Sequence, residues 1–212
     1  MKKIIFLLTF ISITKVSFPQ GIKDINLPEP NKKGGMPIME ALSLRQSKRA
    51  FSNVELTMQQ LADLLWAACG INRPDEGKRT APSAMNDQEI DIYVSLKTGV
   101  YLYDAEKNML KAIKEGDFRK DMGRQGFVAD APVVLVYVAD YSKMSVVMSK
   151  DSKDFYAATD VGFISQNVYL YAASEKMATV VLGMFDRGDI AKAIPLTKNQ
   201  KVLLTQPVGF PK

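Results

Sequence analysis

An uninterrupted apolar run, Pro132–Ala139 (PVVLVYVA), constrains the fold of this 212-residue chain more than any other feature. Its β-branched and aromatic residues favour a strand. Because the run does not alternate with polar residues, we expect both faces of that strand to be covered. The other strand and helix patterns are interspersed with no regular βαβ period, so we predict an α+β fold rather than a Rossmann fold.

Apolar periodicity and turn residues place the remaining elements. Thr57 and Gln60 have the spacing of a capping box, and they open a helix that Gly70 ends. Thr98-Gly99 is the expected turn of a hairpin, and residues 71–86 are expected to form a polar loop. The expected helices span 37–48, 57–69, 155–177 and 188–194, and the other expected strands span 90–96, 100–103, 109–113, 179–182 and 201–208.

The N-terminus has the layout of a secretory signal, since Lys2 and Lys3 precede an uncharged apolar run at 4–13. That run is shorter than the roughly 20 residues that cross a bilayer, and no cysteine nearby could carry a lipid. The alternative, an N-terminal core helix, conflicts with Pro19. We expect residues 1–20 to be a signal peptide, 21–36 an extended arm and 37–212 a single domain. The mature protein would be exported, to the periplasm, without stable membrane insertion.

Composition excludes several kinds of site. The chain has no histidine and one cysteine, Cys69, which removes the usual Ser–His–Asp and Cys–His catalysis, zinc sites of Cys and His, and an intrachain disulfide. We expect no metal site, and a catalyst of this composition would use other polar groups or a cofactor. The net charge of +5 falls to +2 without the lysines of residues 1–20, so a nucleic-acid surface is not supported.

A basic cluster at the end of the first expected helix is a candidate anion site. Arg45 and Arg49 are four residues apart, so on a helix they would project from one face, with Ser47 at the edge between them. Two guanidinium groups and a hydroxyl suit a phosphate, because arginine forms bidentate, charge-assisted bonds to its oxygens. The alternative is a solvated basic helix end that interacts with the helix dipole.

Two further clusters combine small and polar residues. Residues 78–86 (KRTAPSAMN) precede a strand and could approach a flat ligand closely, although alone they would be an ordinary turn. Residues 158–167 (ATDVGFISQN) interrupt the longest helix with small and polar groups, which is also the pattern of a close helix–helix contact.

Together these segments resemble the FMN-dependent nitroreductase family, most closely its azoline-oxidase (SagB-type) branch. The resemblance runs from about residue 37 to residue 211. Its motifs are LRQSKRAF, LLWAACGINR, RTAPSAMN, APVVLVYVAD, VGFISQNVYLYAA and QPVGFP, in that order. It implies a sandwich of a mixed, mostly antiparallel sheet with surrounding helices, whose long central helix lies at a homodimer interface.

The resemblance also implies a set of site residues. Arg45 and Ser47 match residues that hold the FMN phosphate, with Gln46 between them, and Arg49 matches the cation beside flavin N1 and the C2 carbonyl. The backbone N–H of the Gly183–Met184 stretch would face flavin N5. The other matched residues would line the flavin or the dimer interface: Pro82, Ser83 and Asn86 in the loop, and Gln166 and Asn167 on the long helix.

The sequence departs from the family pattern at two places. Many relatives have a Lys-x-Arg segment that completes the phosphate clamp, where this chain has Pro211-Lys212, so Lys212 is the expected substitute. An Asn-x-Gln-Pro run is common where this chain has Asn86-Asp87-Gln88-Glu89.

The implied function is transfer of hydride through flavin N5, from NADH or NADPH to a nitro, quinone or related small-molecule electrophile. A flavin carries the electrons itself, which suits a chain without histidine. Two alternatives stay open, a dehydrogenase of a peptide-derived azoline and a flavin- or ligand-binding protein without turnover.

Overall fold

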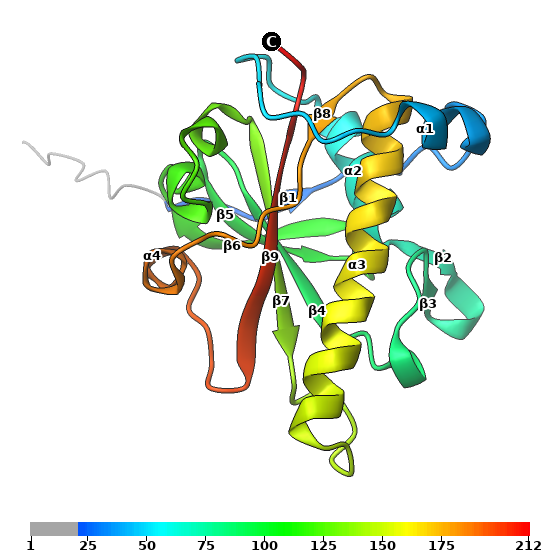
Figure 1. The fold of residues 1–212 in the computed structure, drawn as a ribbon, viewed down its shortest axis with the longest axis vertical. Helices are drawn as coiled ribbons and strands as arrows, with labels where there is room; N and C mark the ends of the chain where they lie inside the picture. Colours follow the sequence, from blue (N-terminus) through cyan, green and yellow to red (C-terminus); the bar gives the residue numbers. More distant parts are fainter. Residues whose placement is uncertain (1–20) are drawn as a thin grey trace, which may run out of the picture.

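The computed structural model describes residues 21–212, and residues 1–20, with the expected signal peptide, lie outside the described part. Seven strands form one sheet in the order β1-β6-β5-β4-β7-β9-β8, and every neighbouring pair is antiparallel (Figure 1). Their bounds are β1 Ile25–Asn26, β4 Ile90–Ser95, β5 Gly99–Asp104, β6 Met109–Glu115, β7 Val133–Asp140, β8 Ala178–Thr179 and β9 Gln200–Gly209. The helices are α1 Ile38–Leu44, α2 Met58–Cys69, α3 Lys150–Ser174 and α4 Arg187–Ala193. The predicted α+β class with a mostly antiparallel sheet is confirmed.

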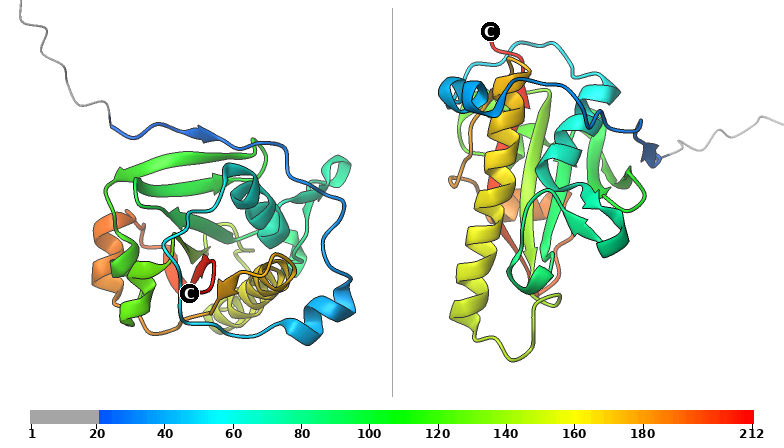
Figure 2. Two further views of the ribbon diagram at one scale, coloured as in Figure 1. Left: turned by 90° about the horizontal axis from the view of Figure 1, so that it is seen from above. Right: turned by 90° about the vertical axis from the view of Figure 1, so that its right-hand side faces the viewer.

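Strand β7 lies inside the sheet and is buried on both faces, as its sequence predicts. Leu135 and Tyr137 belong to a core shared with α2 and α3. Val134 and Val136, which point the other way, belong to a second core that includes residues of α4 and of the short 3-10 helices Arg119–Met122 and Gly126–Asp130. The sheet is therefore covered by α2 and α3 on one face and by α4 with these turns on the other (Figures 1 and 2).

Helix α3 is the longest element, with 25 residues, and it begins five residues before the expected start. Ser149 caps its first turn by accepting a hydrogen bond from the Ser152 N–H. Both α1 and α2 pack against it. None of the helices within residues 21–212 has the length and hydropathy that a bilayer span requires.

Residues 21–36 contain one short strand, β1, which pairs with β6 through Ile25 and Leu110. Figure 2 shows the segment leaving this edge of the sheet and running around to α1. It is fastened near its end by a 2.8 Å hydrogen bond from the Met36 N–H to Ser174 Oγ on α3.

The expected helix 37–48 is five residues shorter in the structure, because α1 begins at Ile38 and ends at Leu44. Arg45 already has extended backbone (φ −56°, ψ 123°). The Lys48 N–H then donates to the Thr179 carbonyl, and Phe51 forms a β-bridge with Pro211. The expectation that Arg45 and Arg49 share one face of a helix is therefore wrong, since pairing with residues distant in sequence holds this segment extended.

The expected polar loop at 71–86 contains more structure than its sequence indicated. Strands β2 (Ile71–Arg73) and β3 (Lys78–Arg79) form a separate antiparallel ribbon. A 3-10 turn joins them and ends at Gly77, whose φ of 62° is left-handed and suits glycine.

The capping box at α2 is confirmed, and it gives a test of the fold. The Gln60 N–H donates to Thr57 Oγ1 at 3.2 Å, and the Thr57 N–H donates to Gln60 Oε1 at 2.9 Å. We expect Thr57→Ala to lower the free energy of unfolding by about 1 kcal/mol. The Gln60 N–H loses its acceptor, and the reciprocal bond from the residue 57 N–H to the Gln60 side chain loses the contact that orients it. Urea titration followed by circular dichroism measures this, and Thr57→Ser, which keeps the hydroxyl, should stay near wild type. Equal losses in both variants would contradict the capping role.

Candidate functional site

Residues 45–49, here the arginine segment, lie extended against α3 through Tyr169. The Arg45 guanidinium lies over the Tyr169 ring, 5.3 Å from its centroid. Ser47 Oγ and Tyr169 Oη are 2.9 Å apart, a hydrogen-bond distance. Stacking of a guanidinium on an aromatic face restricts the arginine while leaving its N–H groups free to bind an anion.

Tyr169 also joins the arginine segment to the chain that follows α3. Its Oη accepts a 2.9 Å hydrogen bond from the Val181 N–H, and the Lys48 N–H donates to Thr179. Residues 47–48 and 179–181 therefore lie close together around Tyr169, and predicted residues Gly183 and Met184 follow this stretch in the chain. Tyr169 is not among the predicted site residues. The signal that could have indicated it is a hydroxyl-bearing aromatic residue in the middle of the predicted long helix.

The groups of this region have unused capacity to bind an anion. No acidic side chain forms a salt bridge with Arg45 or Arg49 in residues 21–212, although other cations form eight such bridges there. Gly183 is exposed, and within the described chain its N–H donates no hydrogen bond. Gln46, also exposed, borders a cavity of about 130 Å³ together with Lys48 and Tyr169.

The backbone of Lys212 lies next to Ala50, which follows the arginine segment, but Lys212 borders a different cavity from Gln46 and Lys48. Its N–H is 3.4 Å from the Ala50 carbonyl oxygen. Its side chain borders a different cavity of about 650 Å³, together with Phe51, Glu55 and Arg119. The structure thus places the C-terminal residue next to the predicted phosphate-binding residues without showing a contact between Lys212 and them.

Residues 82–88, here the Ser83 loop, hold the second group of predicted site residues. Met85, Asn86 and Gln88 have left-handed backbone (φ 54°, 59° and 49°), which is uncommon outside glycine and costs free energy. Pro82, Met85 and Asn86 are exposed. The chain therefore turns sharply here and presents these three residues to solvent.

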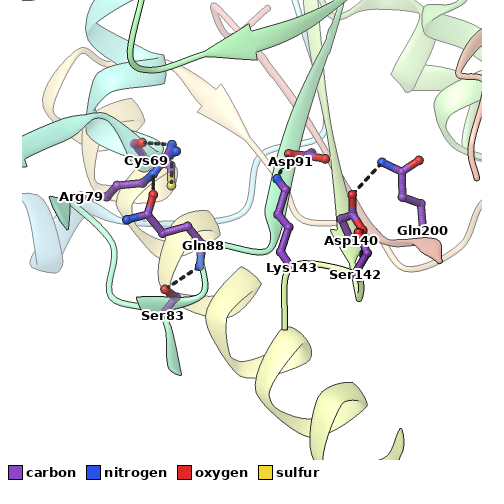
Figure 3. Close-up of polar contacts among 9 residues, drawn as sticks. All are labelled: Cys69, Arg79, Ser83, Gln88, Asp91, Asp140, Ser142, Lys143 and Gln200. Carbon is purple, nitrogen blue, oxygen red and sulfur yellow. Dashed lines mark hydrogen bonds and ion pairs between the residues drawn. The ribbon is translucent and has the colours of Figure 1, made fainter. Parts of the chain in front are cut away.

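Gln88 holds this turn in place (Figure 3). Its N–H donates to Ser83 Oγ at 3.1 Å, and its side-chain amide donates to Asn86 Oδ1 and to the Gly77 carbonyl. Its Oε1 accepts a 2.6 Å bond from Arg79 Nε. One glutamine thus connects the loop to the β2–β3 ribbon, and the predicted Ser83 hydroxyl is used inside the loop.

Two carboxyl groups are buried beneath the Ser83 loop. Glu89 is 0% exposed and Asp160, on α3, is 3% exposed. Asp160 Oδ2 accepts a 2.9 Å hydrogen bond from the Ala84 N–H. Burial, together with the neighbouring Asp160, raises the pKa of Glu89 to about 7, and burial also raises the pKa of Asp160. Within residues 21–212 no group of acidic or cysteine side chains is arranged to hold a metal ion.

The two groups of predicted residues meet α3 at different points. The arginine segment contacts Tyr169, and the Ser83 loop contacts Asp160. Nine residues of helix separate these contacts, which corresponds to about 14 Å at 1.5 Å per residue. The half-buried Gln166 and Asn167 lie between them. One copy of the chain therefore does not bring its Ser83 loop to its own arginine segment.

The Nitroreductase family model matches residues 42–210, which include both groups of site residues. A Methanocaldococcus jannaschii protein provisionally named a nitroreductase is 30% identical over 196 residues, which is 88% of this chain and 96% of that protein. A Ralstonia eutropha crystal structure with the same provisional name has a TM-score of 0.85 and 38% identity, covering 90% of each chain.

Two more distant structures share the fold. An NADPH:FMN oxidoreductase from Vibrio harveyi, solved with NAD⁺, has a TM-score of 0.62 and 22% identity over 82% of this chain and 69% of that chain. A chain of an Escherichia coli microcin synthetase complex has a TM-score of 0.69 and 18% identity over 96% of this chain and 85% of that chain. The family model, the extent of the closer matches and the antiparallel fold agree. The chain belongs to the nitroreductase family and is an oxidoreductase of its flavin-dependent type.

Proposed function

We propose that this protein binds FMN at the arginine segment and transfers hydride from NADH or NADPH to a nitro, quinone or related electrophile. The observation that carries the proposal is that Arg45 and Arg49 form no salt bridge within residues 21–212, while Gly183, two residues beyond the Val181 contact with Tyr169, has a backbone N–H that donates no bond in the same residues. FMN, when bound, supplies the electron-carrying chemistry at its N5.

The donor set fits the chemistry of FMN. Arg45 and the Ser47 hydroxyl would bind the phosphate, with Gln46 adding an amide contact. Arg49 would lie beside the edge of the ring system on which negative charge gathers upon reduction, where a permanently charged group stabilises it. Lys212, one residue beyond the Phe51–Pro211 bridge, would have to turn its side chain from the neighbouring cavity to add a cation.

These contacts alone do not explain tight binding. Nanomolar affinity corresponds to about −12 kcal/mol, whereas each charge-assisted hydrogen bond contributes about 1.5–3 kcal/mol. Coverage of the ring system has to supply much of the rest. The Ser83 loop, with exposed Pro82, Met85 and Asn86, provides suitable surface. Since it contacts α3 at Asp160 and not near Tyr169, we propose that the loop of a second copy covers the site.

The positions of the two contacts along α3 are compatible with such a dimer. The midpoint between Asp160 and Tyr169 falls at Ile164–Ser165, next to exposed Gly162 and Phe163. A twofold axis near this midpoint would place the Ser83 loop of one copy opposite the arginine segment of the other. Exposed apolar side chains continue this surface: Ile38, Met39 and Leu42 on α1, and Phe155 on α3.

The azoline-dehydrogenase alternative is favoured by one observation, the likeness to a microcin synthetase chain over 96% of this chain. Export to the periplasm, which we also propose from residues 1–20, favours a different electron source, because nicotinamide cofactors belong mainly to the cytoplasm. Reduction of the bound flavin by NADH or NADPH would distinguish the nicotinamide-dependent reductase from these alternatives.

The first test is flavin binding. We expect FMN to bind the purified protein and to be quenched in fluorescence titration, with Arg45→Ala weakening the Kd by at least about tenfold through loss of a phosphate contact. Lys107→Ala, which removes an exposed cation from the β5–β6 turn, is the control and should leave the Kd unchanged. A wild-type protein that binds no FMN would refute the flavin site.

The second test concerns Arg49. We expect Arg49→Ala to lower the two-electron potential of bound FMN by about 30 mV, because a cation beside the reduced ring is lost. Potentiometric dye titration measures this, and anaerobic stopped-flow mixing with NADPH or NADH should show slower bleaching. An unchanged potential removes Arg49 from the ring edge. Wild-type protein that binds FMN but reacts with neither donor would favour the alternatives.

The third test concerns the dimer. A Cβ built at Gly162 meets nothing within 4 Å in its own chain, so Gly162→Arg should leave the monomer folded. We expect wild type to sediment as a dimer and Gly162→Arg as a monomer with weaker FMN binding. Gly126→Arg is the matched control, because a Cβ at Gly126 also meets nothing within 4 Å. A monomeric wild type that binds FMN tightly would contradict the shared site.

A further inference from the structure

The carboxyl groups of Glu89 and Asp160 are buried at one small cavity, and neither forms a salt bridge with a cation of residues 21–212. Both side-chain oxygens of Glu89, and Oδ2 of Asp87 nearby, receive no hydrogen bond from an N–H or hydroxyl donor in the described residues. Burying one unpaired carboxylate is costly, and burying two in contact costs more. A proton held between Glu89 and Asp160 removes one charge and supplies the missing donor.

Two cations of this region, Arg79 and Lys143, bond to other groups, and Figure 3 shows these bonds. Arg79 donates to the Cys69 carbonyl and to Gln88 Oε1, and Lys143 pairs with Asp91 at 2.5 Å. The titratable groups around Glu89 are Asp160 on α3, Asp87 in the Ser83 loop, Cys69 on α2, Arg79 on β3 and Tyr141 beyond β7. Arg79 is the one cation of this set, and its bonds go to Gln88 and to the Cys69 carbonyl rather than to a carboxylate.

The pair is connected directly to the strained loop. Asp160 Oδ2 accepts the Ala84 N–H, and Ala84 immediately precedes the left-handed residues Met85 and Asn86. Glu89 directly follows left-handed Gln88, so Asp160 is bonded to the start of the turn and Glu89 lies at its end. Strained backbone of this kind persists only where surrounding contacts determine it.

We propose that Glu89 and Asp160 share one proton and act as positioning residues, which hold the Ser83 loop in the shape that covers the flavin of the second copy. The flavin part of this inference rests on the proposed function. Loss of the shared proton would leave two charges in contact, drive Glu89 and Asp160 apart and release the Ala84 N–H.

The loop should therefore respond to pH. The ordinary pKa of a glutamate is 4.5, and in the folded protein the pKa of Glu89 is raised to about 7. The folded state then binds more protons than the unfolded state between these values, so the stabilising effect is complete below the lower value and is lost as pH rises through the upper one. Protection of the Ala84 amide should fall over the upper part of this range.

Hydrogen exchange on the flavin-free protein tests the shared proton. Between about pH 6 and about pH 8 we expect the Ala84 protection factor of wild type to fall about tenfold. Glu89→Gln, whose amide donates to Asp160 without titrating, should show the same high protection at both values. Asp160→Ala should show low protection at both, and the control Asp151→Ala, an exposed acid on the first turn of α3, should behave as wild type. Protection in wild type that does not change with pH overturns the proposal.

FMN affinity tests the positioning role separately. Relative to Glu89→Gln, the wild-type Kd should weaken about tenfold from about pH 6 to about pH 8, and titration of the FMN phosphate cancels because it is common to both proteins. If Ala84 protection changes with pH but the ratio of the wild-type Kd to the Glu89→Gln Kd stays constant, the positioning role is overturned. If wild type binds no FMN at any pH, the proposed function fails, while the exchange experiment still decides whether the proton is shared.

Discussion

Helix α3 is the element on which the arrangement of this molecule depends. Its buried side packs onto the sheet and α2, and its other contacts fix the two groups of candidate site residues. Tyr169 holds the arginine segment, and Asp160 holds the Ser83 loop. Because a helix is stiff over nine residues, the separation between these groups is set by helical rise rather than by flexible loops. The same stiffness makes a symmetric pairing of two helices a precise way to bring the groups together.

The arginine segment and the region beneath the Ser83 loop differ in charge and in exposure to solvent. In the arginine segment Arg45 and Arg49 form no salt bridge within residues 21–212, and they remain partly or fully exposed, so keeping their charge costs little and leaves it available to an anion. Beneath the Ser83 loop the acids are buried with no cation of the described residues bonded to them, so a proton is the least costly way to neutralise one of them. The arginine segment is therefore suited to binding a ligand, and the buried acids are suited to holding the Ser83 loop.

Family membership and the proposed site support one another at the level of residues. The family match includes the arginine segment, Tyr169, Gly183 and the Ser83 loop. Glu89 stands where the sequence departs from the common Asn-x-Gln-Pro run, and its buried carboxyl group lines the same small cavity as Asp160. The choice of substrate would depend on the side chains that lie above the proposed flavin.

The sequence by itself determined the elements whose signals are local. The apolar run of β7, the Thr57–Gln60 capping box and the Thr98-Gly99 hairpin all follow from neighbouring residues, and the structure has each of them. Only the tertiary structure decided that Arg45–Arg49 is extended, because the pairing of Lys48 with Thr179 and of Phe51 with Pro211 outweighs a helical preference that no local cap stabilises. It also decided that Tyr169 joins two distant segments and that Glu89 meets Asp160. Contacts between different segments of the chain leave no trace in local periodicity, since each partner alone is an ordinary polar or aromatic residue.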